Sequence, residues 1–200
     1  MRMPSDQFGA KPAVLRCSRC GKFVGWEEAQ VQVICSCKPH INLPPVLVRE
    51  ATDADRAAAR ELFERDFGRT RIVAFGEVMD IDQLPALVAV MTAEPSGALA
   101  YRLHGDALHI VALATDPMWQ RSGVGGHLVA EAELLARRLN LNRLVVATTN
   151  DNLPAMYFYQ RRGYRLTDLV VSSVLKHTGR EVNGFGGIPV RDEVRLEKRL

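Results

Sequence analysis

One segment of the sequence combines glycines with polar side chains in a spacing that suits anion binding. Residues 116–126, DPMWQRSGVGG, contain Gly123, Gly125 and Gly126 at the start of a helical pattern. Glycine lets the backbone approach a ligand closely, and the first N–H groups of a helix point outward at the positive end of its dipole. The main-chain amides of residues 121–126 are therefore expected to bind a pyrophosphate, with the Arg121 side chain as a further donor.

A dinucleotide site is the main competing interpretation, because its glycine fingerprint also joins a strand to a helix. Here the spacing is G-x-G-G rather than G-x-G-x-x-G, and the preceding strands form hairpins in the pattern rather than a βαβ unit. A nicotinamide cofactor is therefore not expected.

All four cysteines lie close together near the N-terminus and form a second candidate site. They read C-x2-C, fourteen further residues, then C-x-C, at Cys17, Cys20, Cys35 and Cys37. Four thiolates in two close pairs can surround a tetrahedral Zn²⁺ and leave no open position, so we predict a structural zinc site that resembles a zinc ribbon. Disulfides and free thiols are the alternatives, and a reducing compartment disfavours disulfides. His40 is a further candidate ligand, but four cysteines already complete the tetrahedron.

The overall composition indicates one main domain with a small appendage. The 200 residues carry a net charge of +3, 47% of them are hydrophobic, and no apolar run is long enough to span a bilayer. The N-terminal residues lack the apolar stretch of a secretory signal, so we expect a cytoplasmic protein without membrane contact. Lys and Arg are spread along the chain, which neither indicates nor excludes nucleic acid, and the oligomeric state, a homodimer included, stays open.

Periodicity and cap signals predict the elements that must position these residues. A strand at 46–49 precedes a helix from about Asp53 to Phe67, because Thr52 and Asp55 resemble a capping box. Residues 68–82 have a mixed pattern without a clear element. Apolar runs at 86–91, 99–103 and 108–115, separated by turns at 94–97 and 104–106, predict an antiparallel meander.

A helical period begins after the meander. The apolar stripe of a helix of about sixteen residues is formed by Val124, Leu128, Ala132, Leu135 and Leu139. A short buried strand follows at 144–147, and a second helix begins at Asn152-Leu153-Pro154 and ends at Gly163. Strands at 164–171 and 193–200, joined by a long loop, complete the chain.

Two stretches resemble the cofactor motifs of the GNAT N-acetyltransferase superfamily. QRSGVGG at 120–126 resembles the Q/R-x-x-G-x-G/A acetyl-CoA motif, and TTNDNLPAMYFYQRRGY at 148–164 resembles the second motif, with its Asn, Ala, Phe-Tyr and final Gly-aromatic pair. The resemblance covers about residues 46–200 and includes the order of the elements. It implies an α/β (α+β) fold with a mixed, mostly antiparallel sheet flanked by helices, in a domain at 45–200 that follows a zinc module and linker at 1–44.

The resemblance also implies roles for single residues. The strand that ends at Thr115 would separate from its neighbour and bind the pantetheine arm through its backbone, and Tyr159 would protonate the departing thiolate. Asn152 would contact the cofactor, with helix capping as its alternative role. The implied cofactor-binding residues are Leu113, Ala114, Thr115, Gln120, Arg121, Ser122, Gly123, Val124, Gly125, Gly126, Asn152 and Ala155.

The general base is not defined by the sequence. The strand before Thr115 lacks an acidic residue where many relatives carry one, which leaves His104, His109, Glu77 or a chain of waters as candidates. Asp116 is expected to fix the turn at Pro117 rather than to act as a base.

These features predict an N-acetyltransferase that moves an acetyl group from acetyl-CoA to a primary amine by direct attack. The alternative is a non-catalytic protein, either a sensor of acyl-CoA or an adaptor that its zinc module guides to protein or nucleic acid. The acceptor is open. Residues 68–82 and 172–187 are expected to border its groove, and their mixed polarity fits a small amine or a protein or peptide N-terminus equally well.

Overall fold

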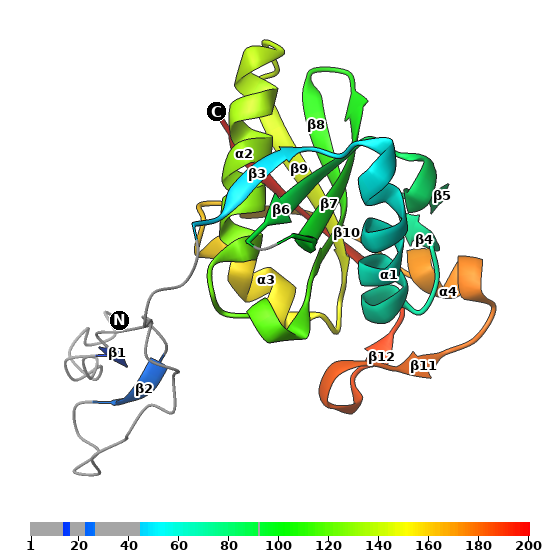
Figure 1. Ribbon diagram of the computed structural model, residues 1–200. Helices are drawn as coiled ribbons and strands as arrows, with labels where there is room; N and C mark the ends of the chain where they lie inside the picture. The colour runs from blue at the N-terminus through cyan, green and yellow to red at the C-terminus, as the bar shows by residue number, and fades with distance from the viewer. Residues whose placement is uncertain (1–13, 17–22, 27–44, 92) are drawn as a thin grey trace, which may run out of the picture. The chain divides into compact units, whose positions relative to one another are not determined.

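The computed structural model describes residues 14–16, 23–26, 45–91 and 93–200 (Figure 1). The chain divides into two units, Met1–Leu43 and Pro44–Leu200. In the first unit, β1 (Val14–Arg16) pairs antiparallel with β2 (Phe23–Trp26). The four cysteines and His40 lie outside the described residues, so the predicted zinc site does too. Among the described residues, no helix has both the length and the apolar character needed to cross a lipid bilayer.

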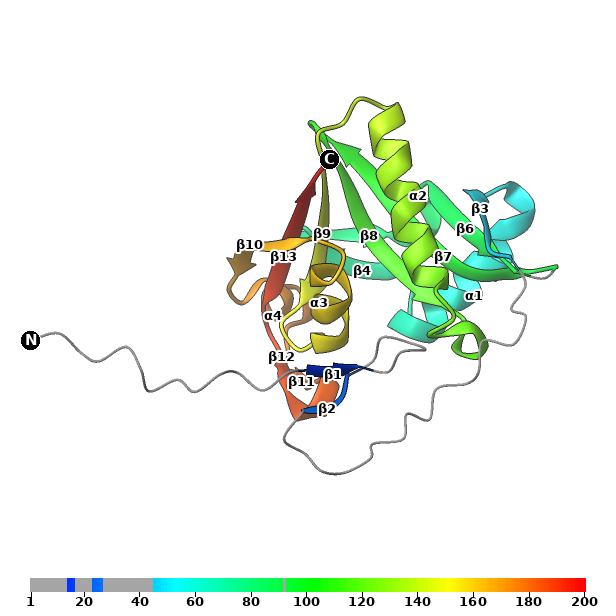
Figure 2. The same ribbon diagram turned by 90° about the vertical axis from the view of Figure 1, so that its left-hand side faces the viewer.

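The second unit is built on a seven-stranded mixed sheet in the order β10-β13-β9-β8-β7-β6-β3 (Figures 1 and 2). Within this sheet β8 and β9 run parallel, and every other neighbouring pair is antiparallel. The mixed, mostly antiparallel sheet expected from the sequence is therefore confirmed. Its strands are β3 (Leu47–Glu50), β6 (Ala86–Val90), β7 (Pro95–His104), β8 (Ala107–Thr115), β9 (Arg143–Thr149), β10 (Arg165–Val170) and β13 (Glu193–Arg199).

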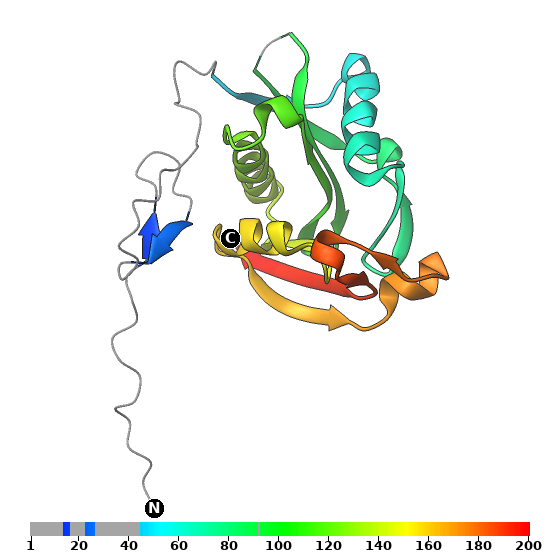
Figure 3. The ribbon, with the colours of Figure 1, turned by 90° about the horizontal axis from the view of Figure 1, so that it is seen from below.

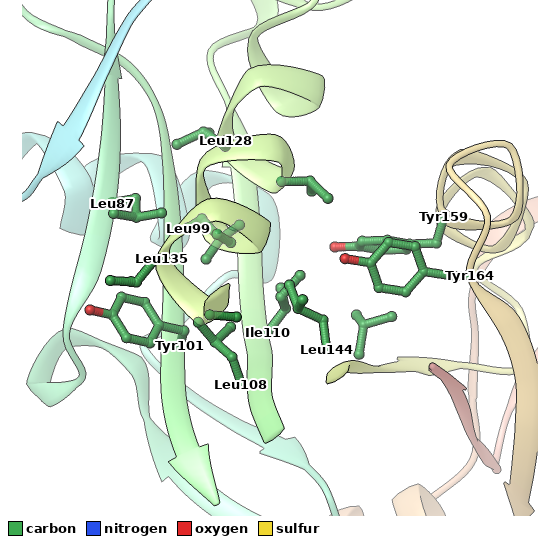
Figure 4. Close-up of a cluster of buried hydrophobic side chains, with 14 of the residues drawn as sticks. Leu87, Leu99, Tyr101, Leu108, Ile110, Leu128, Leu135, Leu144, Tyr159 and Tyr164 are labelled. Carbon is green, nitrogen blue, oxygen red and sulfur yellow. The ribbon is translucent and has the colours of Figure 1, made fainter. Parts of the chain in front are cut away.

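Helices cover both faces of this sheet. Figure 3 shows α2 (Val124–Arg138) and α3 (Leu153–Gln160) on one face and α1 (Arg56–Phe67) on the other. Each face has its own core, because alternate strand residues point to opposite faces. The α2 face buries a cluster that includes Leu99, Ile110, Leu128, Leu135 and Leu144 (Figure 4). The α1 face buries a cluster that includes Phe63, Val88, Ala100, Ala112 and Val145.

The helix starts follow the cap signals in the sequence. The main-chain amide of Thr52 donates to Asp55 Oδ2 at 2.7 Å, and Arg49 makes a two-pronged ion pair with the same carboxylate at 2.6 and 2.9 Å. A 3-10 turn at Asp53–Asp55 leads into α1. Gly68 ends α1 in a left-handed conformation with φ 71°.

The predicted stripe of α2 is confirmed at four of its five positions. Val124, Leu128, Ala132 and Leu135 are buried, whereas Leu139 is 44% exposed because the helix ends at Arg138. Close packing of α2 depends on Gly97 in β7: a Cβ atom there would lie 2.6 Å from Val124 Cγ1.

Three regions differ from the pattern-based assignments. The predicted turn at 94–97 is wrong, because β7 already begins at Pro95 and Gly97 pairs with Thr115. Proline fits this first strand position, where its missing N–H costs no ladder bond. The unassigned segment 68–82 contains the hairpin of β4 (Arg71–Ala74) and β5 (Glu77–Asp80). The prediction of one long loop before the last strand is also wrong in part. The segment contains α4 (Ser173–Thr178) and a short hairpin of β11 (Val182–Asn183) and β12 (Pro189–Val190).

Candidate active site

The two central parallel strands separate toward their C-terminal ends. Their pairing runs from Ala107 opposite Arg143 to Ile110 opposite Val146 and then stops. Beyond this point β8 continues to Thr115 along β7, and β9 continues to Thr149 along β13. The facing edges of residues 111–115 and 147–149 therefore do not pair with each other, which is the separation that the resemblance implied.

A β-bulge in β8 explains where the separation begins. Ala100 of β7 pairs with Ala112, and the next residue, Tyr101, pairs with Ile110. Val111 is the extra residue, and an extra residue bends the strand that carries it. The bulge comes directly after Ile110, the last β8 residue that pairs with β9. The bulge therefore coincides with the point at which β8 and β9 stop pairing.

The start of α2 lies next to this opening. After β8, Asp116 Oδ1 accepts from Met118 N at 2.8 Å, which confirms its expected role in the turn before the helix. Gly123, the N-cap, has φ 101°, a conformation that glycine adopts without strain. The first i to i+4 bond of the helix runs from His127 N to Gly123 O, so the amides of residues 123–126 come before the helix's own bonds. Gly123 is exposed, which leaves this turn accessible to a ligand.

The remaining motif residues surround the same turn. Arg121 has φ 66°, a left-handed conformation, and its side chain is exposed, while Val124 is buried in the core. Ser122 Oγ donates to the carbonyl oxygen of Trp119, so this hydroxyl is used inside the turn. Gln120 is exposed, and its Nε2 lies 3.5 Å from Thr115 O. In β8, Leu113 and Thr115 are half-buried and Ala114 is buried on the α1 face.

An arginine that we did not assign to the cofactor lies against this turn. Arg162 follows α3 and donates from Nη1 to Phe158 O at 2.9 Å, with its guanidinium carbon 3.7 Å from the centre of the Phe158 ring. Its Nη2 is 2.7 Å from the position of a Cβ atom on Gly126. Burial lowers the pKa of Arg162, and Arg161 lowers it further. The signal in the sequence was its spacing, four residues after Phe158, at which two side chains of a helical stretch can meet.

Tyr159 lies inside the core of the α2 face. It is 4% exposed, and its ring meets those of Phe158 and Tyr164 edge-on, with centroids at 5.0 and 5.3 Å. Figure 4 shows the hydroxyls of Tyr159 and Tyr164 both directed toward α2. Burial raises the pKa of Tyr159 above its usual value of about 10. The phenol therefore stays protonated at neutral pH.

Asn152 forms a helix cap in the structure. Its Oδ1 accepts from Ala155 N at 3.1 Å, so both residues belong to the first turn of α3. The preceding residues hold the C-terminal segment: Asn150 Oδ1 accepts from Arg191 N and Asp192 N at 2.9 Å each, and Asp151 Oδ2 accepts from Phe185 N at 3.0 Å. The segment before β13 is therefore fastened to the end of β9.

The three candidate bases lie together beside the paired half of β8. His104 is the last residue of β7, His109 is opposite Val145, and Glu77 forms an ion pair with Arg102 at 2.9 Å. His109 is 9% exposed and stacks on Phe75 at 4.2 Å, and burial together with Arg102 lowers its pKa to about 4. None of the three lies on the residues where β8 and β9 separate. In the described part of the chain, no three His, Cys, Asp or Glu residues gather as a metal site requires.

Comparisons with known proteins agree with this geometry. The acetyltransferase (GNAT) family model matches residues 56–164, which is more than half of the chain. The Bacillus subtilis (strain 168) protein YxbD is 32% identical over 145 residues, covering 69% of this chain and 89% of that protein. The chain belongs to the acetyltransferase (GNAT) family. It is an acetyl-CoA-dependent N-acetyltransferase.

Solved structures share the fold. IAA acetyltransferase from Bacillus cereus ATCC 14579 superposes with a TM-score of 0.61 at 21% identity, over 78% of this chain and 100% of that one. A GNAT family acetyltransferase from Elizabethkingia anophelis, solved with acetyl-CoA bound, superposes with a TM-score of 0.59 at 19% identity, over 78% of this chain and 98% of that one. At these identities the likeness establishes the fold.

Proposed function

We propose that this enzyme transfers the acetyl group to a primary amine by direct attack, with the pantetheine arm of acetyl-CoA lying between the separated ends of β8 and β9. One observation carries the proposal: the β8–β9 pairing stops at Ile110, and the glycine-rich start of α2 follows the same strand end. The unpaired β8 edge offers backbone groups to the pantetheine amides, and one amide there can stabilise the oxyanion of the tetrahedral intermediate.

The phosphates of the cofactor would bind at the start of α2. Main-chain amides of residues 123–126 supply the donors, because the Ser122 amide already donates to Trp119 O at 3.2 Å, and the helix dipole favours an anion there. Arg162 adds a fixed positive charge at Gly126, where a half-buried guanidinium beside a positive helix end favours a bound anion. Among the described residues, Arg162 forms no ion pair with a carboxylate, which leaves its charge available to a phosphate.

Tyr159 is the proposed general acid. It would give its phenolic proton to the thiolate of CoA as the C–S bond breaks. Reference pKa values near 10 for tyrosine and 8.5 for a thiol make this transfer uphill by about 2 kcal/mol. Burial increases that cost and Arg162 reduces it, because burial raises the pKa of Tyr159 and the nearby cation lowers it.

A screen of amines tests the transfer. Purified protein and acetyl-CoA are incubated with a panel of lysine, spermidine, tyramine and a short peptide with a free N-terminus. CoA release is followed with a thiol reagent and the product by mass spectrometry. We expect one amine to give an acetylated product in amounts equal to the CoA released. CoA release at the same rate with and without amines would contradict the proposal.

For the N-terminal unit we propose one structural zinc ion held by Cys17, Cys20, Cys35 and Cys37. The support is the spacing of the thiols and the described hairpin, since β1 ends directly before Cys17 and β2 begins three residues after Cys20. Thiolate ligands of this kind suit a reducing compartment such as the cytoplasm. The ion would supply folding free energy rather than chemistry.

Metal analysis tests the zinc site. We expect one equivalent of zinc after purification in reducing buffer and its loss in a Cys17→Ser, Cys20→Ser double variant. A zinc-free wild-type protein would contradict it. Removal of residues 1–44 should leave acetyl-CoA affinity unchanged if the zinc unit serves docking or regulation.

A further inference from the structure

The acceptor amine has to lose a proton before it can attack. An alkylamine with a pKa near that of lysine, about 10.4, is almost fully protonated at neutral pH and then lacks the lone pair that attacks the thioester. The residues of β8 from Ala107 to Thr115 include no carboxylate, and the candidates His104, His109 and Glu77 lie beside its paired half. A proton acceptor is therefore needed at the separated end of the strands.

Two buried carboxylates lie at that end of the strands: Asp151, whose Oδ2 accepts from Phe185 N in the C-terminal segment, and Glu193 on β13. Glu193 is the first residue of β13, it pairs with Thr149 at the end of β9, and it is only 2% exposed. Its Oε2 accepts from Gly76 N at 3.1 Å, and its Oε1 accepts from Arg195 Nε at 2.7 Å. A carboxylate has about four lone-pair sites, so each oxygen keeps capacity for a further proton donor.

The side chain of Glu193 lies on the face of the sheet opposite the start of α2. Its neighbour Val194 belongs to the core under α2, so Glu193 points to the α1 face, where the β4–β5 hairpin contacts it through Gly76. The start of α2, with the proposed phosphate site, lies on the opposite face. An amine entering from the α1 face would reach the thioester between β8 and β9 without displacing the cofactor.

The groups around this carboxylate come from the β4–β5 hairpin and from four strands of the large sheet. Arg195 of β13 pairs with it, and Asp168 of β10 lies 3.7 Å from the same guanidinium. The hairpin contributes the Gly76 amide and the Phe75 ring, which Arg102 of β7 and Arg195 flank at 5.3 and 5.8 Å, and on which His109 of β8 stacks. Phe75 has φ 57°, an uncommon conformation for a bulky residue, and it directly precedes Gly76, whose amide donates to Glu193.

We propose that Glu193 accepts the proton of the acceptor ammonium. This inference rests on the proposed function. The ammonium gives one proton to Glu193, the neutral nitrogen forms the C–N bond, and the tetrahedral intermediate collapses with loss of the C–S bond. Tyr159 protonates the thiolate, and the second proton leaves the nitrogen of the newly formed amide and restores the phenol by way of solvent. Glu193 releases its proton to solvent, so the products are the amide, the CoA thiol and one H⁺.

The test is the pH profile of a Glu193→Gln variant with the panel amine that the wild-type protein acetylates fastest. Glutamine keeps an acceptor for Gly76 N but takes up no proton. We expect kcat/KM to fall about 10²-fold at pH 7. Without a base, the rate should follow the fraction of neutral amine and rise about tenfold per pH unit up to the amine's pKa. The deficit should therefore shrink as the pH rises.

Two variants separate this role from a structural one. Glu197 lies on the same strand, beside the part of β8 and β9 that is paired, and its carboxylate forms an ion pair with Arg143 at 2.8 Å. Glu197→Gln should therefore keep the wild-type dependence of kcat/KM on pH. Glu193→Asp keeps a carboxylate and should recover part of the rate at pH 7. A Glu193→Gln deficit that is equal at every pH would overturn the proposal. Acetyl-CoA affinity is measured for the same proteins and tests the proposed function separately. A wild-type protein that does not bind acetyl-CoA would contradict the proposed function rather than the role of Glu193.

Discussion

Arg162 Nη2 lies 2.7 Å from the point where a Cβ atom on Gly126 would stand. The absence of a side chain at the first turn of α2 therefore makes room for a guanidinium from the end of α3. This contact joins the two sequence motifs of the acetyltransferase, because Gly126 closes the first and Arg162 lies near the end of the second. We infer that the two motifs form one binding surface for the phosphates of acetyl-CoA.

Replacement of Arg162 by alanine should weaken acetyl-CoA binding. The variant loses a charge-assisted hydrogen bond to phosphate, which contributes on the order of 1.5 to 3 kcal/mol, so the Kd should rise by roughly tenfold or more. Isothermal titration calorimetry measures this. Arg161→Ala is the matched control, since Arg161 instead contacts Tyr157, with Nη1 3.2 Å from the phenolic oxygen. If both variants raised the Kd equally, Arg162 would contribute only to the overall positive charge of the protein and would make no specific contact with phosphate.

Tyr159→Phe should reduce turnover while keeping cofactor affinity. Loss of a general acid lowers the rate by about 10²-fold or more, and the ring that packs the core is retained. Tyr164→Phe is the control: it removes another buried hydroxyl of the same cluster, which lies 3.5 Å from Glu133 Oε1. Steady-state rates with the fastest panel amine and acetyl-CoA titrations provide the comparison. A Tyr159→Phe enzyme with wild-type turnover would rule out the proposed acid.

His109 should make the fold sensitive to acid. Its folded pKa is about 4, below the unfolded value near 6.5, so the unfolded chain binds more protons between these values. The contribution of His109 is therefore complete above pH 6.5 and is lost as the pH falls through 4, by an amount on the order of 2 kcal/mol. Urea unfolding at several pH values should show that the free energy of unfolding of the wild-type protein falls toward acid pH. The same fall should be much smaller in the His109→Phe variant. The exposed His127 should make no such difference when it is replaced by glutamine.

Leu128→Ala should destabilise the domain by about 2 to 5 kcal/mol, because it leaves a cavity between α2 and the sheet. Leu128 is fully buried, whereas Leu139 is 44% exposed beyond the end of the helix. Leu139→Ala should therefore change the free energy of unfolding by less than about 0.5 kcal/mol. Chemical denaturation of both variants checks the difference. Similar losses would show that α2 continues its apolar stripe through Leu139.

The elements with strong local signals could be predicted from the sequence. α1, α2 and α3 have cap residues and an apolar period, and the cap hydrogen bonds of Asp55 and Asn152 are present as expected. The motif spacing likewise predicted the open start of α2. These features depend on contacts within a few residues, which the sequence shows directly.

Features that depend on distant partners were not predictable in the same way. The β4–β5 hairpin turns at Phe75 and Gly76, and Phe75 tolerates its left-handed conformation because it stacks on His109, 34 positions later in the chain. Glu193 is separated from Gly76 by 117 positions, so its burial follows only from the sheet order. The short elements within 172–192 are held by Asn150 and Asp192 rather than by their own pattern.

Val111, the extra residue in β8, affects which amino-acid replacements and deletions the opening between the strands can tolerate. Because the strands stop pairing at this additional position, and Val111 itself points into the core under α1, the place of the separation depends on the length of β8 more than on which side chains it carries. Many residues around the opening can therefore be exchanged while the gap persists, whereas loss of a single position would bring the two strands together along their full length.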